Sequence, residues 1–208
     1  MTFDREAMLA LLDEMLASHG PIGDEREIDA VVLREFKATA AHKDELGMIV
    51  SHVHDDGSLR VKALGGAFPW KYGEGPLDVI ADDGSIVRAV LSLGSYHTMS
   101  GPIGEFRRGE RTPTWDDVTL FTGQSADELL EHGVHVGSRV VMQRERKRLR
   151  RLPGGHIVGF GLDDRMGLVG LVFLLRQVMH ESLAADLYLA VTTSEETGYL
   201  GAKRVAQV

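Results

Sequence analysis

The sequence contains no cysteine, no apolar run long enough to cross a bilayer, and no excess of positive charge. Without cysteine, disulfide bonds are excluded, and a transition metal would have to be held by histidine and carboxylate side chains. A membrane-spanning helix needs about 20 consecutive apolar residues, so no membrane partner is expected. The first residues also lack the cationic and apolar pattern of a signal peptide. We therefore expect a cytoplasmic protein.

The charge balance is acidic, with 23 Lys and Arg against 31 Asp and Glu and a net charge of −8. This disfavours nucleic acid and anionic membranes as partners. The strongest basic run, Arg144 to Arg151, has no interleaved aromatic residues of the kind that stack on bases. We expect it to be an exposed strand end or an oligomer contact. With 43% apolar and 26% charged residues, the composition is that of a soluble globular protein.

Two helices are predicted near the N-terminus. The first ends at Gly20-Pro21, and its apolar residues fall on one face: Met8, Leu11, Leu12, Met15 and Leu16. The second begins at Asp24, with Glu27 three residues later as in a capping box. Residues 46–50 then have the apolar pattern of a buried strand. An Asp-Asp-Gly turn at 55–57 predicts a hairpin.

The pattern changes after about Gly65. Residues 66–155 hold short strand-like segments, frequent glycine, a second Asp-Asp-Gly turn at 82–84, and one helix with Ser125 and Glu128 in capping-box spacing. Next come an apolar helix over 166–179 and a buried strand over 187–191. We expect an α/β fold in which a small β domain, residues 66–155, is inserted between the two parts of an α/β domain, residues 1–65 and 156–208.

The most informative feature is the pair Glu195-Glu196 at the end of the last predicted strand. Adjacent carboxylates at the mouth of a buried strand repel each other and lose hydration, so something positive is expected beside them. A metal with a bound water fits, because one glutamate can ligate while its neighbour takes a proton from the water. The alternative is a loop of solvated carboxylates.

Two further motifs offer ligands. His42 and Asp44 precede the strand at 46–50, and if this segment is extended they share a face, so Asp44 could orient a metal-bound imidazole. The alternative is an ordinary surface histidine. Asp163 and Asp164 precede the apolar helix, where acidic groups are also favoured by the helix dipole alone. Carboxylates with one imidazole suit Zn²⁺, Co²⁺ or Mn²⁺.

Three stretches together resemble a known family. They are the segments 41–50 (AHKDELGMIV), 161–167 (GLDDRMG) and 193–202 (TSEETGYLGA), and they are similar in order and spacing to the tetrahedral (TET-type) dinuclear metallo-aminopeptidases. That family includes glutamyl and deblocking aminopeptidases, some of which carry an endoglucanase label. The resemblance implies an α/β/α catalytic domain with an inserted β-barrel or PDZ-like domain, and a homo-oligomer, in this family a dodecamer.

The resemblance also implies a role for each site residue. His42 would bind one metal and Glu196 the other, with Asp163 bridging both and the Asp163–Asp164 peptide cis. Glu195 would be the general base, and Asp44 would support His42. The cofactors would be two divalent ions, Zn²⁺ or Co²⁺, and the substrates peptides with a free N-terminus. The family uses one further Asp and one further His beyond the double-glutamate motif, which we expect in a longer polypeptide. It also has a strand pair near residues 36–40 that the sequence lacks.

Two other functions remain open. One is a non-catalytic relative, or a fragment, that keeps the fold but not a complete metal site. The other is a dinuclear amidase that acts on a different small amide, such as an acylated amino acid. A blocked N-terminus separates the second from an aminopeptidase, because a true aminopeptidase should not cleave it.

Overall fold

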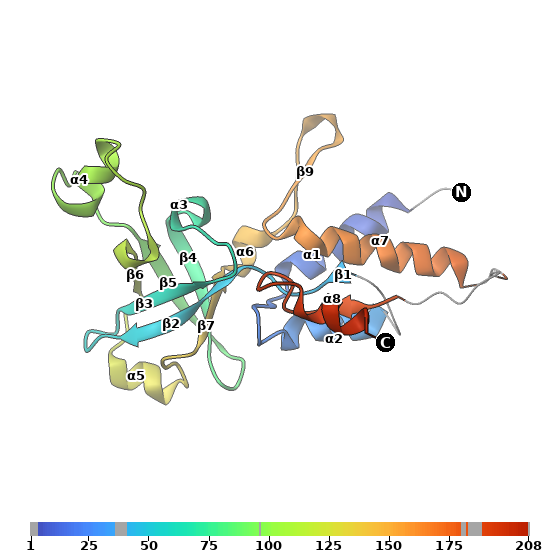
Figure 1. Ribbon diagram of the computed structural model, residues 1–208, viewed down its shortest axis with the longest axis horizontal. Helices are drawn as coiled ribbons and strands as arrows, with labels where there is room; N and C mark the ends of the chain where they lie inside the picture. Colours follow the sequence, from blue (N-terminus) through green and yellow to red (C-terminus); the bar gives the residue numbers. More distant parts are fainter. Residues whose placement is uncertain (1–3, 36–40, 96, 180–181, 183–188, 208) are drawn as a thin grey trace. The chain divides into compact units, whose positions relative to one another are not determined.

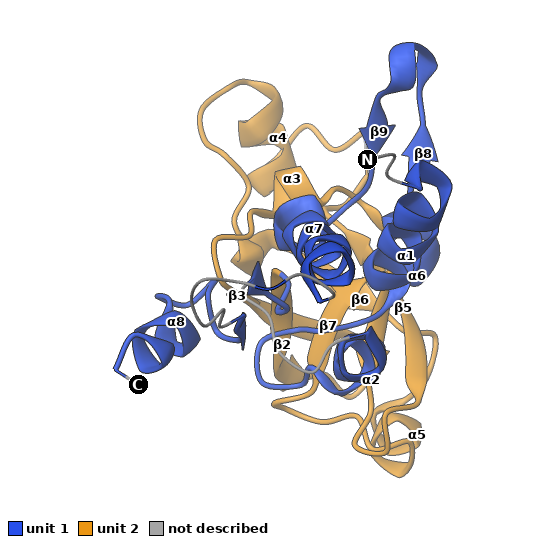
Figure 2. Ribbon diagram, turned by 90° about the vertical axis from the view of Figure 1, so that its right-hand side faces the viewer, with its two compact units in different colours: residues 1–45, 144–208 blue, residues 46–143 orange. Residues whose placement is uncertain are grey.

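A computed structural model describes residues 4–35, 41–95, 97–179, 182 and 189–207 of the chain. The chain forms two compact units (Figures 1 and 2). Unit 1 comprises residues 1–45 and 144–208, and unit 2 is the continuous segment 46–143 between them. Among the described residues, no helix combines the length and hydrophobicity that a bilayer crossing requires.

Unit 2 is built on a closed antiparallel barrel with the strand order β2-β3-β6-β5-β4-β7. Its strands are β2 (Gly47–Val53), β3 (Leu59–Leu64), β4 (Gly75–Ile80), β5 (Ile86–Ser92), β6 (Thr119–Phe121) and β7 (Arg139–Met142). Short helices lie in the connections: α3 (Pro69–Tyr72), α4 (Gly101–Arg107), the 3₁₀ turn Trp115–Asp117 and α5 (Ala126–Glu131). Closure leaves the barrel without a free sheet edge.

Alternating side chains fill the barrel, as the period of a strand requires. Leu120 on β6 lies opposite Leu59 on β3 and Leu91 on β5, and all three side chains are buried. The next residue, Phe121, points outward and is 53% exposed. The barrel core therefore rests on interdigitated aliphatic side chains.

Unit 1 is mainly helical around a two-stranded parallel sheet, β1 paired with β10. Its elements are α1 (Arg5–Ala17), α2 (Arg26–Glu35), β1 (Ala41–His42), α6 (Arg144–Lys147), β8 (Arg150–Arg151), the 3₁₀ turn Pro153–Gly155, β9 (Ile157–Val158), α7 (Leu162–Val178), β10 (Val191–Thr192) and α8 (Leu200–Val205). Strands β8 and β9 form a separate small hairpin.

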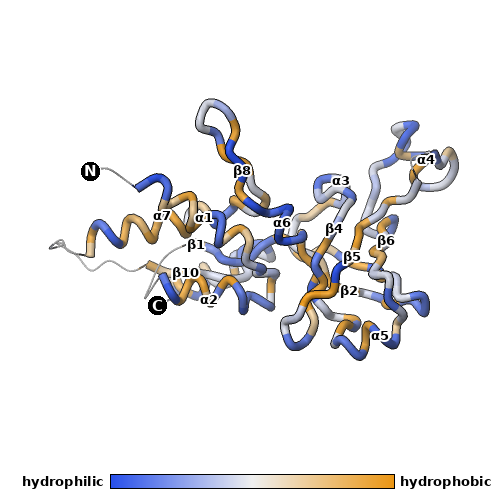
Figure 3. The backbone as a smooth tube through the Cα atoms, turned by 180° about the vertical axis from the view of Figure 1, so that it is seen from behind, coloured by the Kyte–Doolittle hydropathy of each residue, from blue (hydrophilic) through white to orange (hydrophobic). Residues whose placement is uncertain are grey.

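The core of unit 1 lies where α1, α2 and α7 meet. Its buried members are Leu11, Leu12, Met15, Leu16, Ile28, Val31, Val32, Leu168, Val169, Val172 and Phe173. The hydropathy colouring of Figure 3 shows the apolar character of the middle of α7, between charged residues near its two ends. The predicted apolar stripe of the first helix is confirmed, because its residues supply one wall of this core.

The two compact units have other bounds than the domains expected from the sequence. The expected α/β domain comprises residues 1–65 and 156–208 and the expected insertion residues 66–155, whereas the compact β unit is 46–143. The reason is strand pairing: β2 is hydrogen-bonded to β3 on one side and to β7 on the other. Both strands of the first hairpin therefore belong to the barrel.

Other local predictions had mixed outcomes. Both Asp-Asp-Gly hairpins and the Ser125–Glu128 capping box are confirmed. The Asp24–Glu27 capping box is wrong, because Asp24 pairs with Arg26 while Glu27 accepts from the amide of His19. The predicted strand 187–191 lies partly outside the described residues, as does the segment 36–40, and the described strand there is β10.

The packing of Leu120 generates a stability prediction. Leu120→Ala should lower the free energy of unfolding of the barrel by about 2–5 kcal/mol, because it leaves a cavity between three strands. Both tryptophans, Trp70 and Trp115, lie in residues 46–143, so tryptophan fluorescence during urea unfolding reports on this unit. Phe121→Ala, at the exposed neighbour, is the matched control. Equal destabilisation by the two variants would contradict the packing described here.

Candidate functional site

The parallel pairing of β1 and β10 brings two of the sequence motifs together. Ala41 lies opposite Val191 and His42 opposite Thr192, and the amide of Lys43 donates to the carbonyl of Thr192. Both strands run in the same direction, so the residues that follow them, Asp44 and the 193–196 loop, emerge at the same end. This is the carboxyl edge, where α/β folds gather their sites.

His42 is buried and faces carboxylates on both sides of its ring. Its Nε2 lies 3.3 Å from Asp163 Oδ1 and 3.9 Å from Glu195 Oε2, and its Nδ1 lies 3.6 Å from Asp44 Oδ1. The interpretation of His42 as an ordinary surface histidine is therefore wrong. The structure brings together His42, Asp44, Asp163 and Glu195 from three separate motifs.

Asp44 is the buried support of this arrangement, with a side chain that is 0% exposed. Its two carboxylate oxygens accept hydrogen bonds from the amides of Glu195 and Glu196, each at 3.3 Å. Burial alone would raise the pKa of Asp44, but His42 and these two amides hold it below its ordinary value. Asp44 is thus an ionised carboxylate that ties the histidine strand to the glutamate loop.

The two aspartates before α7 have different roles. Asp164 Oδ1 accepts from the amide of Gly167 at 3.0 Å, which caps the first turn of the helix. A Cβ on residue 167 would lie 2.2 Å from this oxygen, so glycine leaves room for the cap. Asp163 instead extends toward His42 and is 91% exposed. The Asp163–Asp164 peptide is cis, as the resemblance implies.

Glu195 and Glu196 are partly exposed and lie in the turn between β10 and α8. Donor atoms of His42, Glu195 and Glu196 all lie within 4.8 Å of one another. Burial, together with the repulsion of Glu195 and Asp163, raises the pKa of Glu196 above its ordinary value, against the attraction of His42. Adjacent carboxylates are thus crowded here, as the sequence analysis expected.

The donor set fits a divalent cation. Two atoms that bind the same zinc ion at about 2.1 Å are separated by at most about 4 Å, and Nε2 of His42 lies within that range of both Asp163 and Glu195. Nδ1 of His42 faces Asp44 Oδ1 at 3.6 Å, just beyond hydrogen-bond distance, so Nε2 remains the nitrogen available to a metal, and Asp44 lies on the side from which a carboxylate can support a metal-bound imidazole.

The sequence did not reveal that two further charged residues, Glu45 and Lys147, are buried. Glu45 and Lys147 are both buried and form an ion pair of 2.9 Å. Lys147 lies within the basic run that the sequence analysis placed on an exposed strand end or an oligomer contact, and for this residue the exposed position is wrong. Lysine is seldom buried unless it is paired, and the run shows no pattern that marks one member as internal. The only feature of the sequence that draws attention to Glu45 is its position next to Asp44.

The sequence of the chain is similar to that of known aminopeptidases. The sequence profile of the M42 glutamyl aminopeptidases matches residues 34–208. The lysyl aminopeptidase of Pyrococcus furiosus is 28% identical over 197 residues, which cover 88% of this chain and 52% of that protein. The chain therefore spans about half the length of the curated relatives that it matches.

Solved structures of aminopeptidases are similar to this chain in fold. An aminopeptidase from the archaeon Desulfurococcus kamchatkensis superimposes with a TM-score of 0.82 at 26% identity, covering 97% of this chain and 60% of that one. The Pyrococcus horikoshii TET1 peptidase, described as assembling into a tetrahedron or a large octahedral shell, gives 0.78 at 25% identity, covering 96% and 64%. The fold is thus that of the TET aminopeptidases.

The electrostatics of the site generate a prediction for the metal-free protein. The Asp44 carboxylate, with Asp163 and Glu195, raises the pKa of His42 to about 9 despite burial. Asp44→Asn removes the main stabilising charge, so the pKa of His42 should fall toward its ordinary value of about 6.5. A pH titration of the imidazole nitrogens by NMR measures it.

His135 provides the matched control for that titration. The carbonyl of Val136 and the carboxylate of Asp82 raise its pKa, and its Nε2 lies 2.9 Å from Asp82 Oδ1. Asp82→Asn should lower the pKa of His135 alone, and Asp44→Asn should leave it unchanged. A His42 pKa that stays near 9 in Asp44→Asn would show that Asp44 is not its principal partner.

Proposed function

The chain belongs to the M42 glutamyl aminopeptidase family, and from this premise we propose that the protein is a metal-dependent aminopeptidase that removes residues from the N-terminus of peptides. One observation carries the proposal: His42 Nε2 faces Asp163 and Glu195 within 4 Å, in front of the buried carboxylate of Asp44. All of these residues lie within the matched range 34–208.

We assign the metal ligands by combining this geometry with the family resemblance. His42 would bind one divalent ion, Glu196 the other, and Asp163 both; Zn²⁺ and Co²⁺ suit this mixture of imidazole and carboxylate. When bound, such ions lower the pKa of a water molecule and polarise the scissile carbonyl. The crowding of Glu195, Glu196 and Asp163 supports the assignment, since a cation would relieve both of the effects that raise the pKa of Glu196, namely burial of its charge and the repulsion of Glu195 and Asp163.

The protein's own groups would handle the proton. Glu195 is 28% exposed, so its carboxylate can reach both solvent and a bound substrate. In the proposed mechanism Glu195 takes a proton from the attacking water and returns it to the leaving amine. Asp44 would keep His42 oriented, with Nδ1 toward the carboxylate and Nε2 toward the ligand position. A free substrate amine near the carboxylates would restrict cleavage to the first peptide bond.

The proposal includes assembly of the protein into a homo-oligomer. The TET1 peptidase, to which the chain is similar, is described as a tetrahedron or an octahedral shell. We propose self-assembly of the present protein on the same principle, with a dodecamer as the expected size, so that its sites face an enclosed space.

The proposed base can be tested separately from the ligands. Glu195→Gln should reduce hydrolysis of aminoacyl chromogenic substrates by roughly 10²- to 10⁴-fold, the range of general acid–base catalysis, while bound metal per chain stays near that of the wild type. Elemental analysis of the purified protein measures the metal. Glu196→Gln is the contrasting variant, expected to lose metal and activity together. Metal loss in Glu195→Gln would instead make Glu195 a ligand.

Chelation and substrate blocking separate the alternatives. Removal of metal should abolish activity, and added Zn²⁺ or Co²⁺ should restore it. Turnover of N-acylated substrates in preference to free-amine substrates would favour the dinuclear amidase. Absence of both metal and turnover, even with added Zn²⁺ or Co²⁺, would leave the non-catalytic relative.

A further inference from the structure

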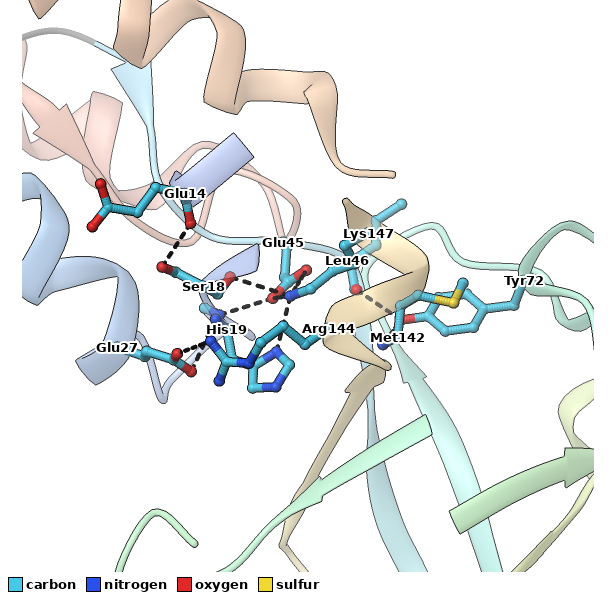
Figure 4. A network of polar contacts seen from close by, with 11 residues as sticks. Glu14, Ser18, His19, Glu27, Glu45, Leu46, Tyr72, Met142, Arg144 and Lys147 are labelled. Atoms are coloured by element: carbon cyan, nitrogen blue, oxygen red, sulfur yellow. Dashed lines mark hydrogen bonds and ion pairs between the residues drawn. The ribbon is translucent and has the colours of Figure 1, made fainter. Parts of the chain in front are cut away.

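A buried ion pair in unit 1, between Lys147 and Glu45, includes the residue that follows Asp44 in the chain (Figure 4). Lys147 on α6 is 0% exposed and Glu45 is 3% exposed. The ammonium nitrogen of Lys147 donates to both carboxylate oxygens of Glu45, at 2.9 and 3.1 Å, and to the carbonyl of Ser18 at 3.1 Å. It also lies 2.9 Å from Nδ1 of His19. The lysine is therefore held by four polar atoms at once.

Glu45 is fixed through its main chain as well. Its amide donates to the carbonyl of Gly20 at 2.8 Å, and the amide of Gly20 donates back to Glu45 Oε1 at 2.8 Å. Although burial alone would raise the pKa of Glu45, Lys147 and Arg165 hold it below its ordinary value. The residue is thus an ionised carboxylate whose backbone and side chain are both constrained.

This constraint reaches the site through one peptide bond. Glu45 follows Asp44, and consecutive Cα atoms are about 3.8 Å apart, so a displacement of Glu45 moves Asp44. Asp44 in turn receives the amides of Glu195 and Glu196 and faces His42. Hydrogen bonds of 3.3 Å are sensitive to small shifts, since their geometry is already at the long end of the normal range.

The position of the pair in the chain adds to the argument. Glu45 is the last residue of unit 1 before residues 46–143, and Lys147 is the fourth residue after them. The ion pair therefore joins, inside unit 1, the segment that leaves it and the segment that returns to it. The strands that continue these segments, β2 and β7, are paired in the barrel, and the ion pair adds a contact between the same two parts of the chain within unit 1, across 102 positions of sequence.

We propose that the Lys147–Glu45 ion pair is a positioning element that holds Asp44, and through it His42 and the Glu195–Glu196 amides, in the arrangement that binds the divalent cation. The inference rests on the proposed function. It assigns the pair a purpose other than stability, because a buried ion pair can often be replaced by uncharged residues of similar volume without loss of stability. Uncharged residues of similar volume would not reproduce the directed hydrogen bonds that Lys147 donates to Glu45.

The test compares single variants with the double variant. Lys147→Met leaves Glu45 buried without its cation and should lower the melting temperature of the purified protein, followed by circular dichroism. The double variant Glu45→Gln/Lys147→Met removes both charges and keeps an acceptor for Gly20, so its melting temperature should recover toward the wild-type value. Its dissociation constant for Zn²⁺, measured by calorimetry on metal-stripped protein, should remain raised on the order of 10–100-fold.

Two further variants sharpen the comparison. Glu45→Asp keeps the charge but shortens the side chain, and it should weaken Zn²⁺ binding even if the double variant does not fold. The exposed pair Arg151–Glu6, 58% and 71% exposed in the same unit, is the matched control, and Glu6→Gln/Arg151→Met should change neither melting temperature nor Zn²⁺ affinity.

The outcomes distinguish this inference from the function on which it rests. Wild-type Zn²⁺ affinity in both Glu45→Asp and a folded double variant would overturn the positioning role while leaving the proposed function intact. Affinity that recovers in step with melting temperature would also overturn it, because the pair would then be purely structural. Failure of the wild type to bind Zn²⁺ would overturn the proposed function, and the inference with it.

Discussion

The candidate site depends on a single buried carboxylate, that of Asp44. It accepts the amides of Glu195 and Glu196 and faces the ring of His42, so it joins parts of the chain about 150 residues apart. A buried carboxylate without partners would lose its hydration at a large cost in free energy. Asp44 is therefore compatible with this fold only while the β1–β10 pairing delivers both amides to it.

Besides Asp44, unit 1 buries further charged side chains. Among the described residues of unit 1, the buried charged side chains include two carboxylates, Asp44 and Glu45, and two cations, Lys147 and Arg165. Lys147 contacts Glu45 directly, whereas both terminal nitrogens of Arg165 are buried without a hydrogen-bond partner among the described residues. Such a cluster contributes little net stability, which is consistent with a role in fixing geometry.

Sequence reasoning succeeded where the information was local. Helical periodicity located α1, and the Asp-Asp-Gly turns located both hairpins, because a few neighbouring residues determine each of these. It failed where a distant partner decides. The pairing of β2 with β7 moved the unit boundary to residue 46, and the burial of Lys147 depends on Glu45, 102 positions away. The motifs named the candidate residues, but only the fold shows which of them are buried.

The division between buried and open residues has a chemical consequence. Asp44 is fully buried, whereas Asp163 is 91% exposed and Glu195 is 28% exposed. Two amides and His42 hold the pKa of the buried carboxylate down, whereas burial first, and then the charges of Glu195, Asp163 and Asp44, raise the pKa of Glu196 against the attraction of His42. Several carboxylates are thus gathered on the accessible side of His42, whose single positive charge offsets only part of theirs. In the proposed function, a divalent cation bound by these carboxylates would relieve their mutual repulsion, and the buried residues behind them would keep them close together.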